Sequence, residues 1–265
     1  MRILMIGDIV GVPGREALSA YLSQIKKIYT PDVVIANGEN AANNGRGIQR
    51  AIVQELFLAG VDCITLGNHA WGQQEIFDFI DEEAKLIRPA NFPEDTPGKG
   101  YTVIQTPAGK MTVINVMGRT FMSSLLDCPF RTVDQILDKI PRSSAVLVDM
   151  HAETTSEKQA LAWYLDGRVS AVVGTHTHVQ TADERILPKG TAYMSDVGMV
   201  GPYDGMIGMD REAVIRRYLT QLPVRFEVAK GRVQFNAVFI ELDKQTKKAK
   251  QVKRIRIDEE NPLFG

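Results

Sequence analysis

Three short apolar runs in the N-terminal part of the chain share the same surroundings. Each is rich in β-branched residues and ends in a polar, glycine-containing turn, which predicts a buried strand. Each precedes a segment with apolar residues three or four positions apart, as at Leu18, Leu22 and Ile25, which predicts an amphipathic helix. The expected strands cover residues 2–6, 31–36 and 61–66, and the expected helices follow the glycine-rich turn 8–14 and cover about 48–59 and 73–84. We therefore predict three successive strand–loop–helix units.

The pattern changes after an irregular stretch rich in proline and glycine at 88–100. Alternating segments on either side of Pro107-Ala108-Gly109-Lys110 predict a hairpin of strands 101–106 and 111–116. The remaining expected elements are a helix near 132–140, strand 145–150, helix 156–165, an apolar run ending at Gly174, short strands 185–187 and 191–195, a loop at 196–209, a helix from Asp210, and strands 224–228, 232–242 and 251–257. Strand–helix units followed by hairpins predict an α/β (α+β) fold of two mixed β-sheets packed together, with helices outside.

Length and composition are those of one ordinary soluble domain. The 265 residues, 44% of them hydrophobic and 24% charged, suffice for a full core, and we expect a single domain over 1–265. No apolar run is long enough to span a bilayer, and the first strand is too short for the core of a signal peptide. We therefore expect a cytoplasmic protein with no membrane partner and, from its size, a homo-oligomer.

Charge and cysteine content narrow the classes of partner. A net charge of −1 and a pI near 6.4 argue against a broad basic surface for nonspecific nucleic-acid binding. The Lys/Arg-rich segment 244–256 alternates with apolar residues and is interpreted as part of a solvated hairpin. The two cysteines, Cys63 and Cys128, fit neither a disulfide framework nor a CxxC motif, so we expect structural thiols.

The candidate chemistry is concentrated where the predicted strands end. His176 and His178 follow an apolar run two residues apart, which places both imidazoles on the same side of an extended backbone. Neutral imidazoles are common metal ligands. The chain has only four histidines, and the other two also follow apolar runs. The polar residues at these strand ends are Asp8, Glu39, Asn40, Asn68, His69, His151, His176 and His178.

Several of these residues also have a purely structural explanation. Asp8 could cap the following helix, and Glu39 and Asn40 could be turn residues. Asn68 could bond only to backbone, and His151 could be a hydrogen-bonded core histidine. Together, these explanations require four histidines to gather at strand ends by chance. The alternative is a site of carboxylate, amide oxygen and imidazole, donors that suit Mn, Fe and Zn, and their number suggests two metal ions.

The order and spacing of these motifs resemble those of the calcineurin-like metallophosphoesterase superfamily. The matching blocks are Gly7-Asp8, Gly38-Glu39-Asn40, Gly67-Asn68-His69, His151 and Gly174-Thr175-His176-Thr177-His178. Two positions depart from the superfamily pattern, because Val10 stands where a histidine ligand is usual and Glu39 where an aspartate is usual. Both departures, with Asn40 as the substitute ligand, resemble the bacterial YmdB-type branch, and this similarity extends over the whole chain.

The resemblance implies a four-layer α/β/β/α sandwich with two divalent or trivalent metal ions, of which iron and manganese are favoured and zinc is an option. It implies one metal site of Asp8, Glu39, Asn40 and His178, and a second of Glu39, Asn68, His151 and His176, with Glu39 as the bridge. It further implies hydrolysis of 2′,3′-cyclic nucleotides to nucleoside monophosphates, with a metal-activated hydroxide as nucleophile and His69 as general acid. The branch is associated with regulation of biofilm and motility behaviour in Gram-positive bacteria.

The sequence supports other function classes to different degrees. The turn at 7–14 lacks the GxGxxG spacing of a dinucleotide-binding loop, and the chain has no GxSxG motif of a serine hydrolase. A regulatory or RNA-binding protein that retains a metal site stays open, because specific RNA recognition needs only a local surface. A phosphomonoesterase stays open as well. Loops 88–100, 118–129 and 196–209 are equal candidates for lining a base pocket.

Overall fold

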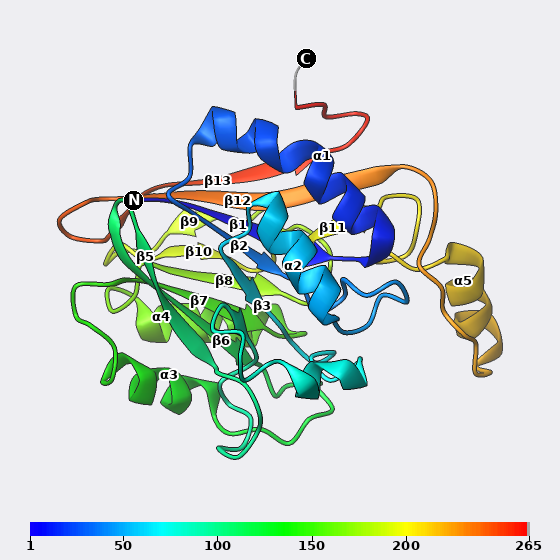
Figure 1. Cartoon of the computed structure of the whole chain (residues 1–265), viewed down its shortest axis with the longest axis horizontal. Helices are drawn as coiled ribbons and strands as arrows, with labels where there is room; N and C mark the ends of the chain where they lie inside the picture. The colour runs from blue at the N-terminus through cyan, green and yellow to red at the C-terminus, as the bar shows by residue number, and fades with distance from the viewer. Residues whose placement is uncertain (264–265) are drawn as a thin grey trace.

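Two β-sheets pack face to face, and helices cover their outer faces, in the computed structural model, which describes residues 1–263 (Figure 1). One apolar cluster lies between the sheets, and one lies under the helices on each side. The predicted α/β/β/α sandwich of two mixed sheets is therefore confirmed.

The first sheet has seven strands. In sheet order these are β13 (Ala249–Ile257), β12 (Val233–Leu242), β11 (Met199–Pro202), β1 (Arg2–Ile9), β2 (Val33–Asn37), β3 (Cys63–Thr65) and β4 (Leu86–Ile87). β1 is parallel to β2 and β11 but antiparallel to β12, and β2 is parallel to β3. Because β1, β2 and β3 are parallel, their carboxyl ends meet at one edge of the sheet, where ligands bind in sheets of this kind.

The second sheet has six strands. In sheet order these are β5 (Tyr101–Thr106), β6 (Gly109–Met117), β7 (Ala145–His151), β8 (Ala171–Thr175), β10 (Ala192–Met194) and β9 (Arg185–Ile186). The four central strands are parallel, and the edge strands β5 and β9 are antiparallel to their neighbours. The carboxyl ends of β7 and β8 therefore also lie together.

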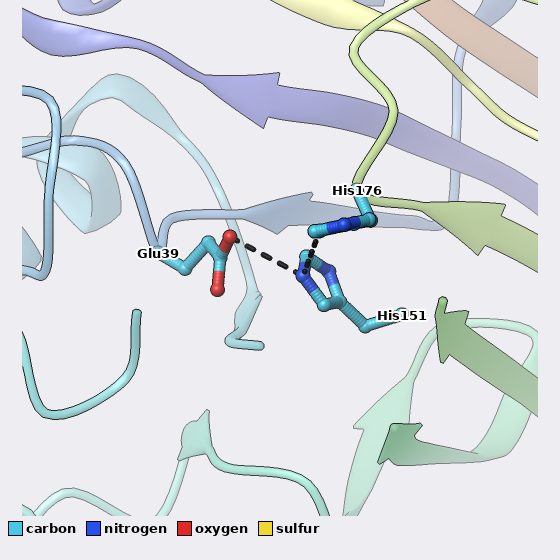
Figure 2. A group of neighbouring side chains, drawn as sticks. All are labelled: Glu39, His151 and His176. Carbon is cyan, nitrogen blue, oxygen red and sulfur yellow. Dashed lines mark hydrogen bonds and ion pairs between the residues drawn. The ribbon is translucent and has the colours of Figure 1, made fainter. Parts of the chain in front are cut away.

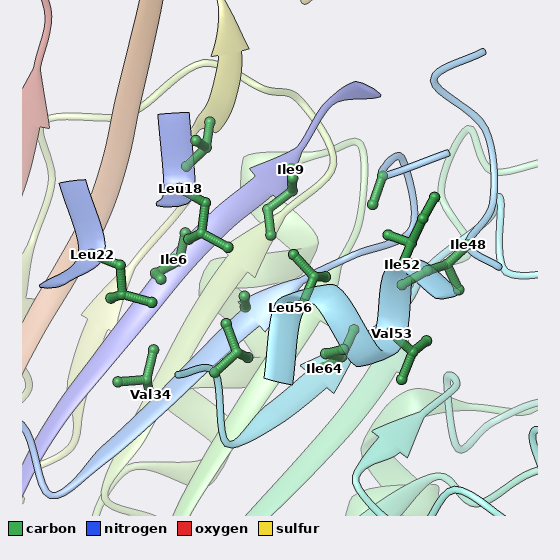
Figure 3. Close-up of a cluster of buried hydrophobic side chains, with 14 of the residues drawn as sticks. Ile6, Ile9, Leu18, Leu22, Val34, Ile48, Ile52, Val53, Leu56 and Ile64 are labelled. Atoms are coloured by element: carbon green, nitrogen blue, oxygen red, sulfur yellow. The ribbon is translucent and has the colours of Figure 1, made fainter. Parts of the chain in front are cut away.

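Helices bridge the parallel strands, as crossover connections require. They are α1 (Gly11–Tyr29) and α2 (Arg50–Ala59) on the first sheet, and α3 (Pro129–Leu137) and α4 (Thr155–Leu165) on the second. Along β1, Leu4 and Ile6 face the helices while Ile3 and Met5 face the other sheet, as the two-residue period of a strand dictates. Figure 3 shows side chains of α1 and α2 meeting those of β1, β2 and β3. Each fully buried aliphatic side chain of this kind contributes about 1.5–3 kcal/mol.

The boundary between β1 and α1 differs from the prediction of a turn at residues 8–14. β1 runs to Ile9 and α1 begins at Gly11. The strand continues because the N–H groups of Asp8 and Val10 still donate to backbone carbonyls beside β1, at 2.9 Å each. Val10 occupies the N-cap position of α1, so the explanation of Asp8 as a helix cap was wrong.

Three other element predictions were also wrong. The helix expected at 73–84 is only the 3₁₀ helix η1 (Gln74–Asp78), because the acidic run at 81–83 would oppose the dipole at a helix C-terminus. No strand forms at 224–228, where an isolated bridge joins Met209 and Val228. The loop expected at 196–209 contains β11, whose glycine and proline concealed it.

Three remaining expectations concern the basic segment, the two cysteines and membrane-spanning helices. The basic segment 244–256 belongs to the antiparallel pair β12–β13, as predicted. Cys63 is buried in β3, Cys128 is partly buried, and both are free thiols. Within residues 1–263, no helix is both long and apolar enough to cross a membrane.

Candidate metal centre

The eight residues predicted from strand ends form one connected cluster. Asp8 ends β1, while Glu39 and Asn40 follow β2. Asn68 and His69 follow β3, His151 ends β7, and His176 and His178 follow β8. Each has a side-chain or backbone contact of 3.9 Å or less with another member of the cluster. The two parallel sets of strand ends, one from each sheet, thus converge on a single site.

Glu39 lies near the middle of this cluster and is almost fully buried. Its Oε1 is 3.2 Å from His151 Nε2, and His151 Nε2 is 3.1 Å from His176 Nδ1 (Figure 2). One ligand atom from each of these three residues lies within 4.8 Å of the others, a spacing that suits a metal ion. Glu39 Oε2 accepts from the backbone N–H of His69 at 2.8 Å, which fixes the carboxylate.

Neighbouring groups fix the tautomer of His151. The Thr175 hydroxyl donates to Asp149 at 2.8 Å, so it accepts from His151 Nδ1 at 2.9 Å. The Nε2 lone pair of His151 then faces three further acceptors: Glu39 Oε1 at 3.2 Å, Asn68 Oδ1 at 2.8 Å and His176 Nδ1 at 3.1 Å. With the ring neutral, four acceptor atoms converge on one point, and either a proton on Nε2 or a metal cation there can satisfy them.

His176 is oriented in the same way by an acidic neighbour. Its Nε2 lies 3.1 Å from Glu153 Oε2, so the ring donates there and presents the lone pair of Nδ1 to the cluster. A carboxylate that holds the outer nitrogen of an imidazole is the usual support of a metal-ligating histidine.

A second group of donors surrounds Asp8. His178 Nδ1 donates to the carbonyl of Ile207 at 2.8 Å, which leaves the lone pair of Nε2 facing Asp8 Oδ1 at 3.9 Å. That separation is too long for a hydrogen bond but suits two ligands of one cation, each about 2.0–2.2 Å from it.

Two buried oxygen atoms in the cluster, Asp8 Oδ1 and Asn40 Oδ1, have no hydrogen-bond partner among residues 1–263. The Asn40 amide nitrogen donates to the carbonyl of Gly45 at 2.8 Å and contacts His69 Nδ1 at 3.1 Å, so the oxygen cannot exchange places with it. Burial of an unpaired polar atom is costly. The donors therefore fit a cation here, as well as one beside His151.

The protonation states follow from burial and charge. Burial lowers the pKa of His176, and the charge of His151 lowers it further, to about 3. Burial alone would lower the pKa of His151 as well, but the Glu39 carboxylate raises it to about 9. Burial raises the pKa of Asp8 well above its usual value, with Asp196 and Glu39 adding to the rise. For Glu39, the cationic His151 outweighs the effect of burial and holds its pKa well below the usual range.

His69 differs from the other three histidines in its exposure. Its side chain is 33% exposed, against 20% for His176, 7% for His178 and 0% for His151. Its Nδ1 lies near Asn40 Nδ2 at 3.1 Å and Glu39 Oε1 at 3.3 Å, and the ring also lines the pocket above the centre. The ring can therefore reach a bound molecule, which the buried His151 cannot.

Sequence reasoning missed a buried ion pair behind the histidine loop. Lys158 Nζ lies 2.8 Å from Asp196 Oδ2, and both side chains are buried. Asp196 also accepts from the backbone N–H of Thr177 at 3.0 Å and of Gly198 at 2.8 Å. The only signal for Asp196 was a polar residue after a short apolar strand, while Lys158 looks like any solvated lysine of an amphipathic helix.

This ion pair supports an unfavourable backbone. The φ angles of His176 and His178 are 104° and 65°, a region that non-glycine residues rarely adopt. Asp196 holds the N–H of Thr177 between them. Gly174 makes room for this arrangement, since a Cβ there would lie 2.7 Å from Lys158 Cδ and 1.8 Å from the carbonyl oxygen of Ser195.

Packing explains why residue 67 is glycine and why residue 10 is not histidine. A Cβ on Gly67 would lie 2.3 Å from His151 Nε2 and 2.5 Å from Glu39 Oε2, so only glycine leaves room for the cluster. Val10 is fully buried, and a Cβ on Gly208 would lie 2.7 Å from its Cγ1. An imidazole at Val10 would need that backbone to move, which is consistent with Asn40 supplying a donor in its place.

A pocket of about 490 Å³ opens onto the centre. Of the three loops considered for it, only 196–209 contributes, through Ile207 and Met209. Loops 88–100 and 118–129 are not among its lining segments within the described chain. Arg46, Tyr218 and Phe226, which sequence reasoning did not single out, complete the outer part.

Comparisons with known proteins identify the family of the chain. The model of the YmdB-like protein family matches residues 4–255. A 2′,3′-cyclic-nucleotide 2′-phosphodiesterase of Bacillus subtilis (strain 168) is 54% identical over 265 residues, 100% of both chains. A solved structure of a hypothetical protein from Thermus thermophilus is 44% identical, with a TM-score of 0.91 over 98% of this chain and 100% of that one.

A solved structure described as a novel phosphatase, from Mycoplasma pneumoniae, is 37% identical, with a TM-score of 0.92 over 97% of this chain and 93% of that one. The fold, the strand-end motifs and the near-complete match to the family lead to the same conclusion. The resemblance seen in the sequence is confirmed, and the chain belongs to the YmdB-like protein family of calcineurin-like metallophosphoesterases.

Proposed function

We propose that this chain is a dimetal phosphodiesterase that hydrolyses 2′,3′-cyclic nucleotides to nucleoside monophosphates. The observation that carries the proposal is the convergence of buried acceptor atoms on two points, one beside His151 and one beside Asp8. The name of the relative that is 54% identical supports the substrate class. The absence of Cys63 and Cys128 from the cluster favours iron or manganese, with zinc as an option.

The acceptor atoms divide into two ligand sets. The set beside Asp8 is Asp8, Glu39, Asn40 and His178, and the set beside His151 is Glu39, Asn68, His151 and His176. We assign Glu39 to both sets, because its Oε1 is 3.2 Å from His151 Nε2 and its charge also raises the pKa of Asp8 and of His178. Bound cations at these points would supply positive charge for the phosphoryl oxygens and acidity toward the attacking water.

Among the histidines, His69 is the proposed general acid. Water attacks the cyclic phosphorus, one ribose P–O bond breaks, and the departing ribose oxygen needs a proton. His151 cannot supply it, because Nδ1 is bound to Thr175 and Nε2 faces the ligand set. His69 is the most exposed imidazole and lines the pocket, so its ring is in position to protonate the leaving oxygen.

Two further expectations from the sequence belong to this proposal. We propose that the protein acts in the cytoplasm as a homo-oligomer, and that its catalysis has a regulatory role in biofilm and motility behaviour. A phosphomonoesterase is the second candidate function, favoured by the description of the Mycoplasma pneumoniae structure as a phosphatase. An RNA-binding role has weaker support, since the chain carries a net charge of −1.

Turnover of a defined set of phosphate esters tests the proposal. Protein loaded with Mn²⁺ or Fe²⁺ is assayed with 2′,3′-cyclic AMP, 3′,5′-cyclic AMP and 3′-AMP, with metal content measured on the same sample. We expect hydrolysis of the 2′,3′-cyclic ester alone, abolished by chelator and by Glu39→Gln. Release of phosphate from 3′-AMP without hydrolysis of either diester, in protein that holds two metals, would establish the phosphomonoesterase instead.

A further inference from the structure

A protruding segment, which we call the arm (residues 210–227), leaves the body of the protein and returns to it. Hydrogen bonds close its base, from Asp210 N–H to the Glu227 carbonyl at 2.9 Å and from Ala229 N–H to the Gly208 carbonyl at 2.9 Å. The helix α5 (Arg211–Thr220) lies within the arm and has no buried residue. Figure 1 shows it projecting from one edge of the molecule. The hydrophobic core therefore does not explain the apolar side chains of the arm.

Two aromatic side chains of the arm line the same pocket as the candidate metal centre. Tyr218 belongs to α5 and is 74% exposed, and Phe226 lies on the returning segment of the arm, which is not a β-strand, and is partly buried. Glu39, His69 and His176 line the inner part of that pocket. The arm thus places aromatic rings on the wall of the pocket that leads to the ligand cluster.

Arg46 lines the pocket from a different segment, the loop after β2. Its backbone is fixed, because its N–H donates to Asn44 Oδ1 at 3.1 Å and its carbonyl accepts from Gln73 Nε2 at 2.8 Å. Its guanidinium, however, makes no hydrogen bond or ion pair with any residue in the described part of the chain. An anchored backbone with an unpaired guanidinium is well suited to binding an anion such as phosphate.

We propose that Tyr218 and Phe226 form a nucleobase subsite and that Arg46 contacts the phosphate, which rests on the proposed nucleotide substrate. The pocket volume of about 490 Å³ lies within the range for small-molecule sites. An aromatic face stacks with any base, since every base has a π-face.

The side-chain carbonyl and carboxylate groups of the pocket leave little acceptor capacity for reading base edges. Asn44 Oδ1 is already occupied by Arg46 N–H and Gln73 Nε2, and Glu153 pairs with His176. The subsite therefore requires a base but accepts purines and pyrimidines alike. The substrate class is a nucleoside 2′,3′-cyclic phosphate of any base, in preference to a base-free sugar phosphate.

A comparison of substrates with and without a base tests the subsite. Tyr218→Ala and Phe226→Ala are assayed with 2′,3′-cyclic AMP, 2′,3′-cyclic UMP and the 2′,3′-cyclic phosphate of methyl riboside, which has no base. We expect KM for both nucleotides to rise about 5- to 150-fold, the equivalent of about 1–3 kcal/mol of base stacking, while KM for the riboside stays unchanged. Arg46→Gln should raise KM for all three esters.

Two variants serve as matched controls. Tyr218→Phe keeps the aromatic face, so it should reverse most of the rise in nucleotide KM that Tyr218→Ala causes. Leu222→Ala changes an exposed apolar residue of the same arm that does not line the pocket, and should leave every KM unchanged. Equal losses on nucleotide and riboside, or no loss in Tyr218→Ala and Phe226→Ala, would overturn the subsite. So would a change in oligomeric state without a base-dependent KM, because the arm would then bind a second copy of the chain.

Binding without turnover separates this proposal from the proposed function. Calorimetry compares 3′-AMP with ribose 3-phosphate on the Mn²⁺-loaded wild type and on Tyr218→Ala. Tighter binding of 3′-AMP that Tyr218→Ala removes would support the subsite even if the protein hydrolysed no diester. Equal affinity of the wild type for the two ligands would overturn it even if the diesterase activity were present.

Discussion

Among single residues, Asn40 gives the most specific indication of a metal site, because its buried side-chain oxygen is unpaired. Its amide nitrogen donates to the Gly45 carbonyl, so the oxygen is held in a buried position where no donor of the described chain reaches it. Asp8 Oδ1 shares this condition. An amide oxygen is a harder and weaker donor than the imidazole that the superfamily usually has, so this cation should be the more weakly held of the two.

Asn40→Ala should therefore remove one cation and leave the other. The variant keeps the donors around His151 intact, so metal content should fall from two ions to one per chain, with most of the activity lost. Elemental analysis after gel filtration measures this directly. Asn40→Asp, which keeps an oxygen at the same place, is the control and should retain both ions. Loss of both ions in Asn40→Ala would contradict the division into two ligand sets.

His69 can be tested by the chemistry of the leaving group. If it protonates the departing ribose oxygen, His69→Ala should lower kcat on a ribose cyclic phosphate by about 10²–10⁴, the range for a positioned general acid. The loss should be much smaller on a nitrophenyl phosphodiester, because a nitrophenolate leaves without a proton. Both rates are measured at saturating Mn²⁺.

Metal content decides whether His69 is a general acid or a residue that holds the metal site together. The variant should keep both ions, whereas His178→Ala, which removes a buried donor, should lose one. Equal losses of rate on the two esters, or a missing ion in His69→Ala, would show that His69 holds the site together and is not the acid.

Among the secondary-structure elements, the strand ends were predicted from the sequence far better than the loops. Apolar runs identify β1, β2, β3, β7 and β8, and the polar residues at the end of each run are then placed at the sheet edge, which is how all eight cluster residues were found. The same reasoning could not find Asp196, because it lies two residues after β10, a strand of only three residues. Nor could it find Tyr218 and Phe226, because no periodicity shows that an exposed arm returns to the pocket.

The buried pair Lys158–Asp196 connects α4 to the loop that presents His176 and His178. Lys158→Met should destabilise the protein by about 3–5 kcal/mol, because it leaves the Asp196 carboxylate buried without its partner. It should also weaken metal binding, because Asp196 holds the Thr177 N–H between the two histidines. Urea denaturation and Mn²⁺ titration measure the two effects.

The double variant Lys158→Met, Asp196→Asn tests whether charge or hydrogen bonding matters more. It removes the unpaired charge, so much of the stability should return. Metal affinity should return less, because one amide oxygen cannot accept from both Thr177 and Gly198 as the carboxylate does. Unchanged stability and affinity in Lys158→Met would show that the pair has no positioning role.

The sandwich as a whole was predictable because its two sheets have different patterns. The strand–helix units give the parallel part of the first sheet, and the 101–116 hairpin marks the start of the second. What could not be predicted is that β11 and β12, from the end of the chain, complete the first sheet beside β1. Such long-range pairing depends on tertiary packing and leaves no local signal.

The complete fold also brings several buried charges to one place, which makes stability depend on pH and metal together. In the protein alone, the His151 pKa of about 9 lies above its unfolded value of 6.5. Its contribution to stability is complete below pH 6.5 and is lost as the pH rises to about 9. Asp8, whose pKa is also raised, likewise makes the protein less stable as the pH rises. The lowered pKa values of His176 and His178 have the opposite effect and destabilise the protein only below pH 6.5.

A bound cation should replace the proton of His151 and remove this loss. Metal affinity should therefore strengthen between pH 6.5 and 9, by about 1.4 kcal/mol per pH unit for one displaced proton. We expect the difference in Tm between Mn²⁺-loaded and chelator-treated protein to widen across that window, measured anaerobically at constant ionic strength. Glu39→Gln is the control for the chelator-treated protein, because Glu39 is the main charge that raises the His151 pKa, and the Tm of the chelator-treated variant should change much less between pH 6.5 and 9 than that of the chelator-treated wild type. If the difference in Tm stays constant or narrows from pH 6.5 to 9, the cation does not displace the proton of His151. His151 would then not be a metal ligand.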